Sequence, residues 1–252
     1  MATPTARSRD ALQQLLDAMW DFGSPEVSEQ RFREAWIDDS SDAHHRAVMA
    51  TQLVRALGLQ SKFSDADAVL DALAGSEPPG EIRARIELER GRLLVSRDAP
   101  ADAIAHFERA VDEAAAVDAA FLEVDALHML AIADAGNERD WAQEGLAIVH
   151  RSGDSRLKRW GVALHNNLGW TEHDAGDAAA ALEHFEAALL FANDHGSAEQ
   201  RHVARWAVGR CLRTLGRDDE ALAIQRELAE QRPDDPFVGE EIAALTGTEP
   251  PT

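Results

Sequence analysis

Apolar residues recur every three or four positions along most of the chain. No window sustains the alternation of apolar and polar residues that is typical of a strand. Residues 9–22 (RDALQQLLDAMWDF) and 25–37 (PEVSEQRFREAWI) each predict an amphipathic helix. Ser24 and Pro25 supply the N-cap residue and the first-turn proline that commonly begin a helix. The pattern predicts an all-α protein.

The helical segments repeat with a fixed internal spacing. Three glycines are each followed by an alanine 12 residues later, in the pairs Gly91–Ala103, Gly169–Ala181 and Gly209–Ala221. The positions four and seven residues after these alanines hold Phe107 and Ala110, Phe185 and Ala188, and Gln225 and Leu228. Small residues at the first two places let two antiparallel helices approach closely, and the phenylalanine fills the space beside them.

Two less regular units complete the series. Ala131 takes the glycine place between the first two clear units, and the four successive places lie 40, 38 and 40 residues apart. The second helix of that unit contains Trp141, Leu146 and Val149. One period earlier, Thr51 takes the glycine place and residues 66–73 (ADAVLDAL) supply the second helix. The sequence therefore predicts about five helix pairs, which must stack because one pair cannot bury its apolar stripe alone.

The stretch HNNLGWTEHDAGDAAAALEHFEAA, residues 165–188, carries the clearest motif. It resembles the tetratricopeptide repeat, whose pattern is Trp-x-x-Leu-Gly-x-x-Tyr, then Ala-x-x-x-Phe, a small residue and a closing proline. His165 and Glu172 stand in the two aromatic places, and Pro233 closes the last unit. The resemblance covers about residues 43–233, with a period longer than the 34 residues of the family. It implies a right-handed α-solenoid of antiparallel helix pairs.

The pattern also predicts how the chain is divided. We expect a disordered tail at 1–8, an N-terminal helical cap at 9–42, five tetratricopeptide-like helix pairs at 43–233, a C-terminal capping helix at 234–246 and a tail at 247–252. The capping helix is expected to cover the last exposed apolar stripe. No linker is long enough to separate domains.

Charge and composition narrow the partners. The chain has 46 acidic and 25 basic residues and a formal net charge of −21. A field of this sign repels phosphate backbones and anionic lipid surfaces, so we expect neither a nucleic acid nor a membrane as partner. The absence of a leader, of a membrane-spanning apolar run and of any cysteine besides Cys211 favours the cytoplasm. We interpret Cys211 as a buried packing thiol.

Candidate binding residues follow from the resemblance, which implies that the first helix of each pair lines a concave groove with an i, i+4, i+7 stripe. The stripes are Val48, Gln52 and Arg55; Leu88, Arg92 and Val95; His128, Ile132 and Ala135; Asn166, Trp170 and His173; and Trp206, Arg210 and Arg213. Asn167 stands beside its stripe, where family members often carry an asparagine that binds a peptide backbone. Tryptophan and arginine are the side chains that most often anchor interfaces. The predicted partner-binding residues are Arg92, His128, Asn166, Asn167, Trp170, His173, Trp206, Arg210 and Arg213.

Some family members grip the C-terminal carboxylate of a partner with two lysines, two asparagines and an arginine. This chain has only Lys62 and Lys158, and Leu88 stands at one of the matching lysine places, so that clamp is not reproduced. A looser grip of arginines on an acidic or carboxylate-bearing segment stays open. The alternative is that the tryptophans pack between helices and the arginines neutralise neighbouring acids.

Catalytic and metal-binding patterns are weak. His165 and His173 are eight residues apart, whereas metal ligands on one helix face need a spacing of three or four. The sequence contains no His-Glu-x-x-His, no glycine-rich phosphate loop and no serine elbow. We therefore expect no enzymatic activity, no cofactor and no metal.

The prediction for function is a non-catalytic scaffold or adaptor that binds a peptide or protein partner in its concave groove. One alternative is a sensor of a small molecule or signalling peptide. Another is an enzyme that uses the cluster from His165 to Asp174. A groove filled by a second copy of the chain is a further alternative, so self-association also stays open.

Overall fold

Helices form nearly all of the described chain. The computed structural model describes residues 6–38 and 40–248, with side chains described from Ala11 onward in these ranges. Within them the secondary structure contains no strand, which confirms the all-α prediction. The helices are α1 (Ala6–Met19), α2 (Pro25–Ile37), α3 (Ala43–Leu59), α4 (Phe63–Ala74), α5 (Gly80–Ser96), α6 (Pro100–Ala115), α7 (Ala120–Ala133), α8 (Glu138–Arg151), α9 (Ser155–Lys158), α10 (Trp160–Asp174), α11 (Ala178–His195), α12 (Ala198–Thr214), α13 (Asp218–Gln231) and α14 (Pro236–Thr246).

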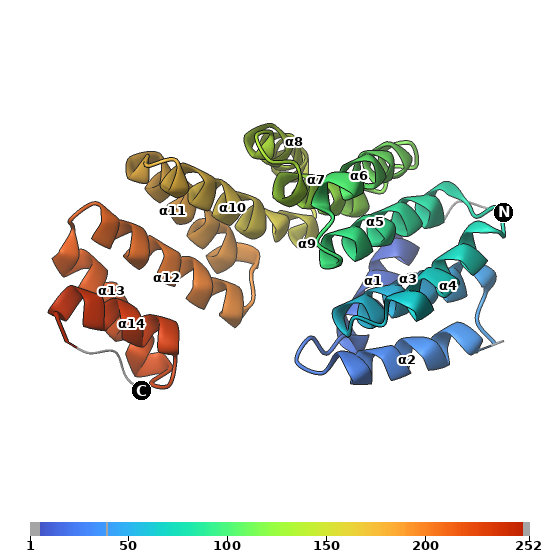
Figure 1. The fold of residues 1–252 in the computed structure, drawn as a ribbon, viewed down its shortest axis with the longest axis horizontal. Helices are drawn as coiled ribbons and strands as arrows, with labels where there is room; N and C mark the ends of the chain where they lie inside the picture. The colour runs from blue at the N-terminus through green and yellow to red at the C-terminus, as the bar shows by residue number, and fades with distance from the viewer. Residues whose placement is uncertain (1–5, 39, 249–252) are drawn as a thin grey trace. The chain divides into compact units, whose positions relative to one another are not determined.

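The chain divides into two compact units, residues 1–129 (unit 1) and 130–252 (unit 2), with the boundary inside α7. In unit 1, α3 packs against α2, α4 and α5, and α5 packs against α6 (Figure 1). In unit 2, helices α10 to α14 pack in chain order, and α12 also contacts α10 and α14. Contact between successive helices, together with contact between the first helices of neighbouring pairs such as α3 with α5 and α10 with α12, is the packing of an α-solenoid built from helix pairs.

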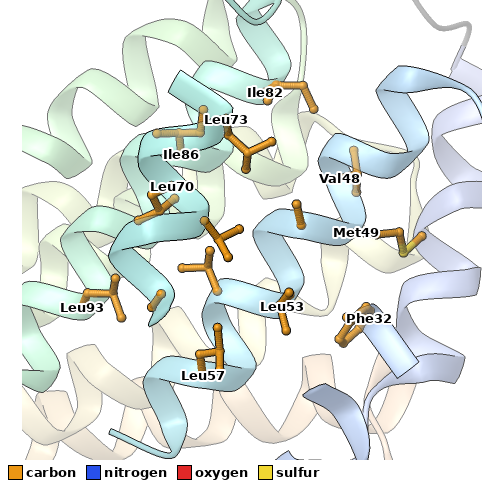
Figure 2. Close-up of a cluster of buried hydrophobic side chains, with 14 of the residues drawn as sticks. Phe32, Val48, Met49, Leu53, Leu57, Leu70, Leu73, Ile82, Ile86 and Leu93 are labelled. Carbon is orange, nitrogen blue, oxygen red and sulfur yellow. The ribbon is translucent and has the colours of Figure 1, made fainter. Parts of the chain in front are cut away.

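The core of unit 1 gathers around α3. Figure 2 shows the buried side chains Phe32, Val48, Met49, Leu53, Leu57, Leu70, Leu73, Ile82, Ile86 and Leu93, which come from α2, α3, α4 and α5. Because α3 is covered by neighbours on several sides, residues 48–54 are all buried, and the helix lacks a clear polar face. Shortening Leu53 to alanine at the centre of this cluster is expected to cost about 2–5 kcal/mol of stability.

The glycine places of the repeat are close helix crossings. At Gly169 an added Cβ would lie 2.5 Å from Cε1 of Phe185, and at Gly91 it would lie 2.3 Å from Cε1 of Phe107. Both phenylalanines are fully buried. Gly209 crosses the second helix of its pair, α13, in the same way, and an added Cβ there would lie 2.7 Å from Nε2 of the buried Gln225. The repeat phase predicted from the Gly-to-Ala spacing is therefore the phase of the packing.

Short turns connect the helices of unit 2. Gly176 and Gly216 have φ angles of 88° and 72°, in the left-handed region that favours glycine. The carboxylate of Asp177 then accepts a hydrogen bond from the backbone N–H of Ala180 at 3.0 Å, which caps the start of α11. Each glycine lies two residues beyond the last residue of its helix, Asp174 of α10 or Thr214 of α12.

Several helix boundaries differ from the prediction. Helix α1 begins at Ala6 and ends at Met19, so residues 6–8 belong to it rather than to a tail. The remaining residues of the predicted tails, 1–5 and 249–252, lie outside the described residues. Ser24 precedes α2 as expected, but its side chain makes no capping hydrogen bond. The short helix α9 was not predicted.

Two further interpretations of the sequence concern the thiol of Cys211 and the possibility of a membrane-spanning helix. Cys211 is fully buried, with Sγ 3.2 Å from the carbonyl oxygen of Ala178, and burial raises the pKa of its thiol. This placement agrees with a packing thiol. Across the described residues, none of the helices combines the length and the apolar character needed to cross a membrane.

Candidate partner-binding surface

An aromatic row in unit 2 joins side chains of α11, α10, α12 and α14. Ring centroids are 4.9 Å apart between Phe185 and Trp170, 6.1 Å between Trp170 and Trp206, and 6.2 Å between Trp206 and Phe237. The row begins at Phe185, which is fully buried, and ends at Phe237, whose side chain is 63% exposed. Trp170 and Trp206 are partly buried, so they pack against neighbours and also keep accessible surface. The structure thus brings the two predicted tryptophans together.

Helix geometry explains this placement. Trp170 follows Gly169 directly, and Trp206 precedes Gly209 by less than one turn. The glycines face the second helix of their own pair. Trp170 lies close enough to reach both Phe185 of α11 and Trp206 of the neighbouring first helix, α12. Stacking of successive pairs then brings the rings into contact.

A hollow of about 630 Å³, here called the Trp206 hollow, opens at one end of the row. It is lined by Glu199, His202, Val203 and Trp206 of α12 and by residues 232–237, which comprise the connection from α13 and the first two residues of α14. Val203 is 45% exposed, and with Phe237 it gives the hollow an apolar surface. Pockets that bury small ligands or single anchoring side chains have volumes of this order.

The loop that forms one wall of the hollow is fixed by Asp235. Its carboxylate accepts hydrogen bonds from the backbone N–H groups of Phe237 and Val238 at 3.0 and 3.3 Å, and the other oxygen lies 2.8 Å from Nε2 of His202. Burial alone would raise the pKa of Asp235, but these hydrogen bonds lower it. The indole Nε1 of Trp206 also donates to the carbonyl oxygen of Phe237 at 3.3 Å. The backbone of Phe237 is therefore held at both its N–H and its carbonyl group.

The two predicted arginines of α12 face an acid of the same chain. Arg213 donates from Nε and Nη2 to the two carboxylate oxygens of Glu241 at 2.8 and 3.2 Å, and Nε of Arg210 lies 3.0 Å from the same carboxylate. Glu241 belongs to α14 and is buried. Its hydrogen bonds raise the pKa of Arg213. Both guanidinium groups thus have a carboxylate partner within unit 2.

The predicted polar residues of α10 have separate surroundings. Nε2 of His173 lies 2.9 Å from Oγ1 of Thr214, and its ring stands edge-on to Trp170 at 5.4 Å. The amide atoms Oδ1 of Asn166 and Nδ2 of Asn167 are buried and have no hydrogen-bond partner among the described residues. His173 therefore lies beside the aromatic row, next to Trp170.

Arg92 and His128, the two other predicted site residues, lie in unit 1. Arg92 donates to Glu89 and to Asp125, each at 2.5 Å, and both carboxylates are buried. Burial opposes the charge of Arg92, but Asp125 and Glu89 raise its pKa. Burial, more than any neighbour, lowers the pKa of His128 to about 4, while the charge of Asp125 opposes this shift. Arg92 is thus the centre of a buried charge network.

The histidines of the proposed catalytic cluster do not converge. His165 Nδ1 lies 3.1 Å from Nδ1 of His184, whereas His173 contacts Thr214. Burial, followed by the charges of His184 and His150, lowers the pKa of His165 to about 4. Among the residues that the structure describes, no three histidine, cysteine or carboxylate side chains are grouped as metal ligands.

Three residues of this surface were missed by the sequence analysis. Val203 and Phe237 line the Trp206 hollow, and Glu241 neutralises the arginines of α12. Phe237 carries a signal that could have been used, because a phenylalanine directly after the helix-opening proline of a cap has no fixed burial partner in the repeat pattern. Glu241 carries no such signal, since its role depends on how α14 docks.

Comparisons with known proteins agree with this geometry. The family model described as "Tetratricopeptide repeat" matches residues 198–236, which span α12, α13 and the loop of the Trp206 hollow. The crystal structure of the apo form of RapI is similar in fold, with a TM-score of 0.70 at 12% sequence identity. The similarity covers 94% of this chain and 71% of that chain. No curated protein matches the sequence.

The matched repeat, the solenoid packing and the agreement in fold support one assignment. The family match falls on the last full helix pair of the predicted series, and the glycine crossings show that the earlier pairs follow the same phase. Residues 198–236 match the tetratricopeptide repeat model, and the chain as a whole has the fold of a tetratricopeptide-like α-solenoid.

Proposed function

We propose that the chain is a non-catalytic scaffold that binds a segment of a protein partner along α12 and α14, with an apolar side chain of the partner inserted into the Trp206 hollow. The observation that carries this proposal is the exposed ring of Phe237 at the mouth of an apolar hollow. Exposed apolar surface that is concave and fixed in place is typical of an interaction site. The fold supports a protein-interaction role in general.

The charges beside the hollow favour an apolar anchor over an acidic one. Arg210 and Arg213 already share Glu241, and Arg232 pairs with Glu199 at 2.6 Å on the rim. A carboxylate of a partner would have to compete with these internal acids. The net charge of −21 also disfavours an acidic partner at long range. A protein partner, rather than nucleic acid or membrane, and a cytoplasmic location remain part of the proposal for the same electrostatic and compositional reasons.

The test compares two exposed apolar residues of unit 2. Phe237→Ser removes the anchor ring, whereas Leu190→Ser changes a side chain of α11 that is 62% exposed and does not line the hollow. Both substitutions should leave the melting temperature nearly unchanged, because exposed positions contribute little to stability. Partners captured from native lysate and identified by mass spectrometry should be lost with Phe237→Ser only. Equal capture by the two variants would reject the proposal.

A sensor of a small molecule is a second candidate, because the volume of the Trp206 hollow also suits a compact apolar ligand. A ligand of this kind would stabilise the isolated protein in the absence of any partner. Thermal-shift screening of wild type and Phe237→Ser with small apolar compounds distinguishes the two candidates. A compound that stabilises only the wild type, combined with no captured protein, would favour the sensor.

A further inference from the structure

The corner between α1 and α2 in unit 1 presents a fixed pair of aromatic rings. Trp20 and Phe22 stack with centroids 4.7 Å apart and an interplanar angle of 2°. The indole Nε1 of Trp20 donates to Oε1 of the buried Gln52 at 2.8 Å, and its ring packs on Phe32 at 5.1 Å. Phe22 is 63% exposed. One member of the stack is therefore anchored in the core, and the other is open to solvent.

The backbone of this corner is held by local hydrogen bonds. The hydroxyl of buried Ser28 accepts from the backbone N–H of Asp21 at 2.8 Å and donates to its carbonyl oxygen at 3.0 Å. The carboxylate of Asp21 accepts from the N–H groups of Gly23 and Ser24, each at 3.1 Å. The position of Phe22 is thus set before any ligand arrives, which reduces the entropic cost of binding.

Arg55 of α3 lies beside both rings. Its Cζ atom is 5.6 Å from the centroid of Trp20 and 5.7 Å from that of Phe22. No group among the described residues accepts a hydrogen bond from its guanidinium. A partly buried guanidinium normally uses several of its five N–H donors on acceptors of the protein. Arg55 has a cation–π contact and lacks such an acceptor.

A second arginine of unit 1, Arg97, has both an aromatic ring and a carboxylate as partners. Arg97 lies 5.0 Å from the ring centroid of Phe63, the same kind of cation–π contact. Its Nη2 also donates to Oδ2 of Asp67 at 2.5 Å and to the carbonyl oxygen of Phe63 at 3.4 Å. A stacked arginine in this chain can therefore also have a carboxylate partner. Within the described part of the chain, Arg55 has no such carboxylate partner.

The acids whose charges act on Arg55, and the acid next to Trp20 and Phe22 in sequence, are engaged elsewhere. Glu89 and Asp125 are bridged by Arg92, and the carboxylate of Asp21 is occupied by the backbone of its own turn. The positive charge of Arg92, followed by burial, lowers the pKa of Arg55, although Glu89 and Asp125 oppose this shift. One additional negative charge beside Arg55 would offset both the repulsion by Arg92 and the cost of burying the guanidinium charge. A dianion is less suited, because Glu89 and Asp125 would repel it.

We propose that Trp20, Phe22 and Arg55 form a binding site for a carboxylate attached to a flat apolar group. The carboxylate accepts two parallel hydrogen bonds from Arg55, the geometry in which guanidinium and carboxylate match best. The apolar group stacks on the exposed face of Phe22. A C-terminal aromatic residue of a peptide and a free aromatic acid share this chemistry. The site lies in unit 1 and is independent of the Trp206 hollow.

The probe is 3-phenylpropionate, and the readout is the indole N–H resonance of Trp20, assigned with a Trp20→Phe variant. We expect a saturable shift with the acid. The uncharged 3-phenylpropanamide should bind at least about tenfold more weakly than the acid. N-acetylphenylalanine distinguishes the two sources. Tighter binding than 3-phenylpropionate assigns the site to a peptide terminus, and equal or weaker binding assigns it to a free acid.

Variants of matched chemistry complete the test. Arg55→Gln should abolish the shift, whereas Arg97→Gln should leave it unchanged, because Arg97 pairs with Asp67 and stacks on Phe63 rather than on Trp20 or Phe22. Phe22→Ala, at an exposed position that should not affect folding, should weaken binding severalfold even if Arg55→Gln proves unstable. The proposal is overturned if the acid gives no saturable shift, if the amide binds equally well, or if Phe22→Ala binds as tightly as wild type.

Discussion

Arg213 of α12 and Glu241 of α14 form a two-point ion pair, with Nε to Oε2 at 2.8 Å and Nη2 to Oε1 at 3.2 Å. Arg210 joins the same carboxylate at 3.0 Å. The arginines expected to meet a partner therefore meet the last helix of their own chain. The ion pair fixes α14 on α12 with charge as well as with apolar contacts. The arginines are thus occupied, whereas the neighbouring Trp206 hollow keeps an exposed apolar surface.

The first prediction concerns this ion pair. Glu241→Ala should lower the free energy of unfolding by about 1–2 kcal/mol, because two partly exposed guanidinium groups lose one buried acceptor. Glu240→Ala, one residue earlier on the exposed side of α14, is the matched control and should change stability by less than about 0.5 kcal/mol. Urea denaturation measures both. Equal effects would mean that the carboxylate does not hold α14 in place.

The second prediction concerns the repeat crossing at Gly169. Gly169→Ala places a methyl group 2.5 Å from the ring of the fully buried Phe185, so the pair must separate or the ring must turn. Such overpacking typically costs about 1–3 kcal/mol. Gly153→Ala is the control, since an added Cβ there meets no described atom within 4 Å apart from the adjoining residues. A variant at Gly169 that is as stable as the control would contradict the crossing.

The third prediction concerns pH. The pKa of His165 falls to about 4 in the folded chain because of burial and of the nearby His184 and His150, against about 6.5 in the unfolded chain. The unfolded state therefore binds the proton more readily. The stability associated with neutral His165 is present above about pH 6.5 and is lost as the pH falls toward 4.

Substitution isolates this contribution from that of His128, which titrates in the same range. Between pH 7 and pH 5, wild type should lose about 1 kcal/mol more stability than His165→Phe, after allowance for solvent screening at this partly exposed site. Phenylalanine keeps the ring contact with Phe191, whose centroid lies 5.7 Å from that of His165. Parallel pH profiles of the two proteins would show that His165 is not the titrating group.

The sequence predicted the parts of this structure that depend on local spacing. The interval from Gly169 to Ala181 and Phe185 is determined by helix geometry within one pair, so the crossing could be predicted without knowledge of other units. The repeat phase also placed Trp170 and Trp206 on neighbouring first helices, and their rings lie 6.1 Å apart in the structure. The sequence could not predict which residue of the same chain a long side chain contacts. Arg213 could reach an acid on several neighbouring helices, and only the docking of α14 selects Glu241.

The last prediction concerns Arg92, which the sequence analysis placed on a binding surface and which the structure places between two buried acids. Glu89 and Asp125 are 2% and 5% exposed, and each receives one hydrogen bond from Arg92. Arg92→Leu leaves both carboxylates without that donor. Breaking a buried ion pair by removing one partner typically costs about 3–5 kcal/mol, because the remaining charge stays desolvated.

The exposed ion pair of Arg83 with Glu113 supplies the comparison for Arg92. Arg83 donates to Glu113 at 2.9 and 2.7 Å, a geometry as good as that of Arg92, but its side chain is 50% exposed. Arg83→Leu should therefore cost only about 0–1 kcal/mol. Adding Glu89→Gln and Asp125→Asn to Arg92→Leu should recover part of the lost stability, because neutral amides are less costly to bury than carboxylates. A small effect of Arg92→Leu, similar to that of Arg83→Leu, would mean that Arg92 does not neutralise buried charge, and it would restore this residue as a candidate for partner binding.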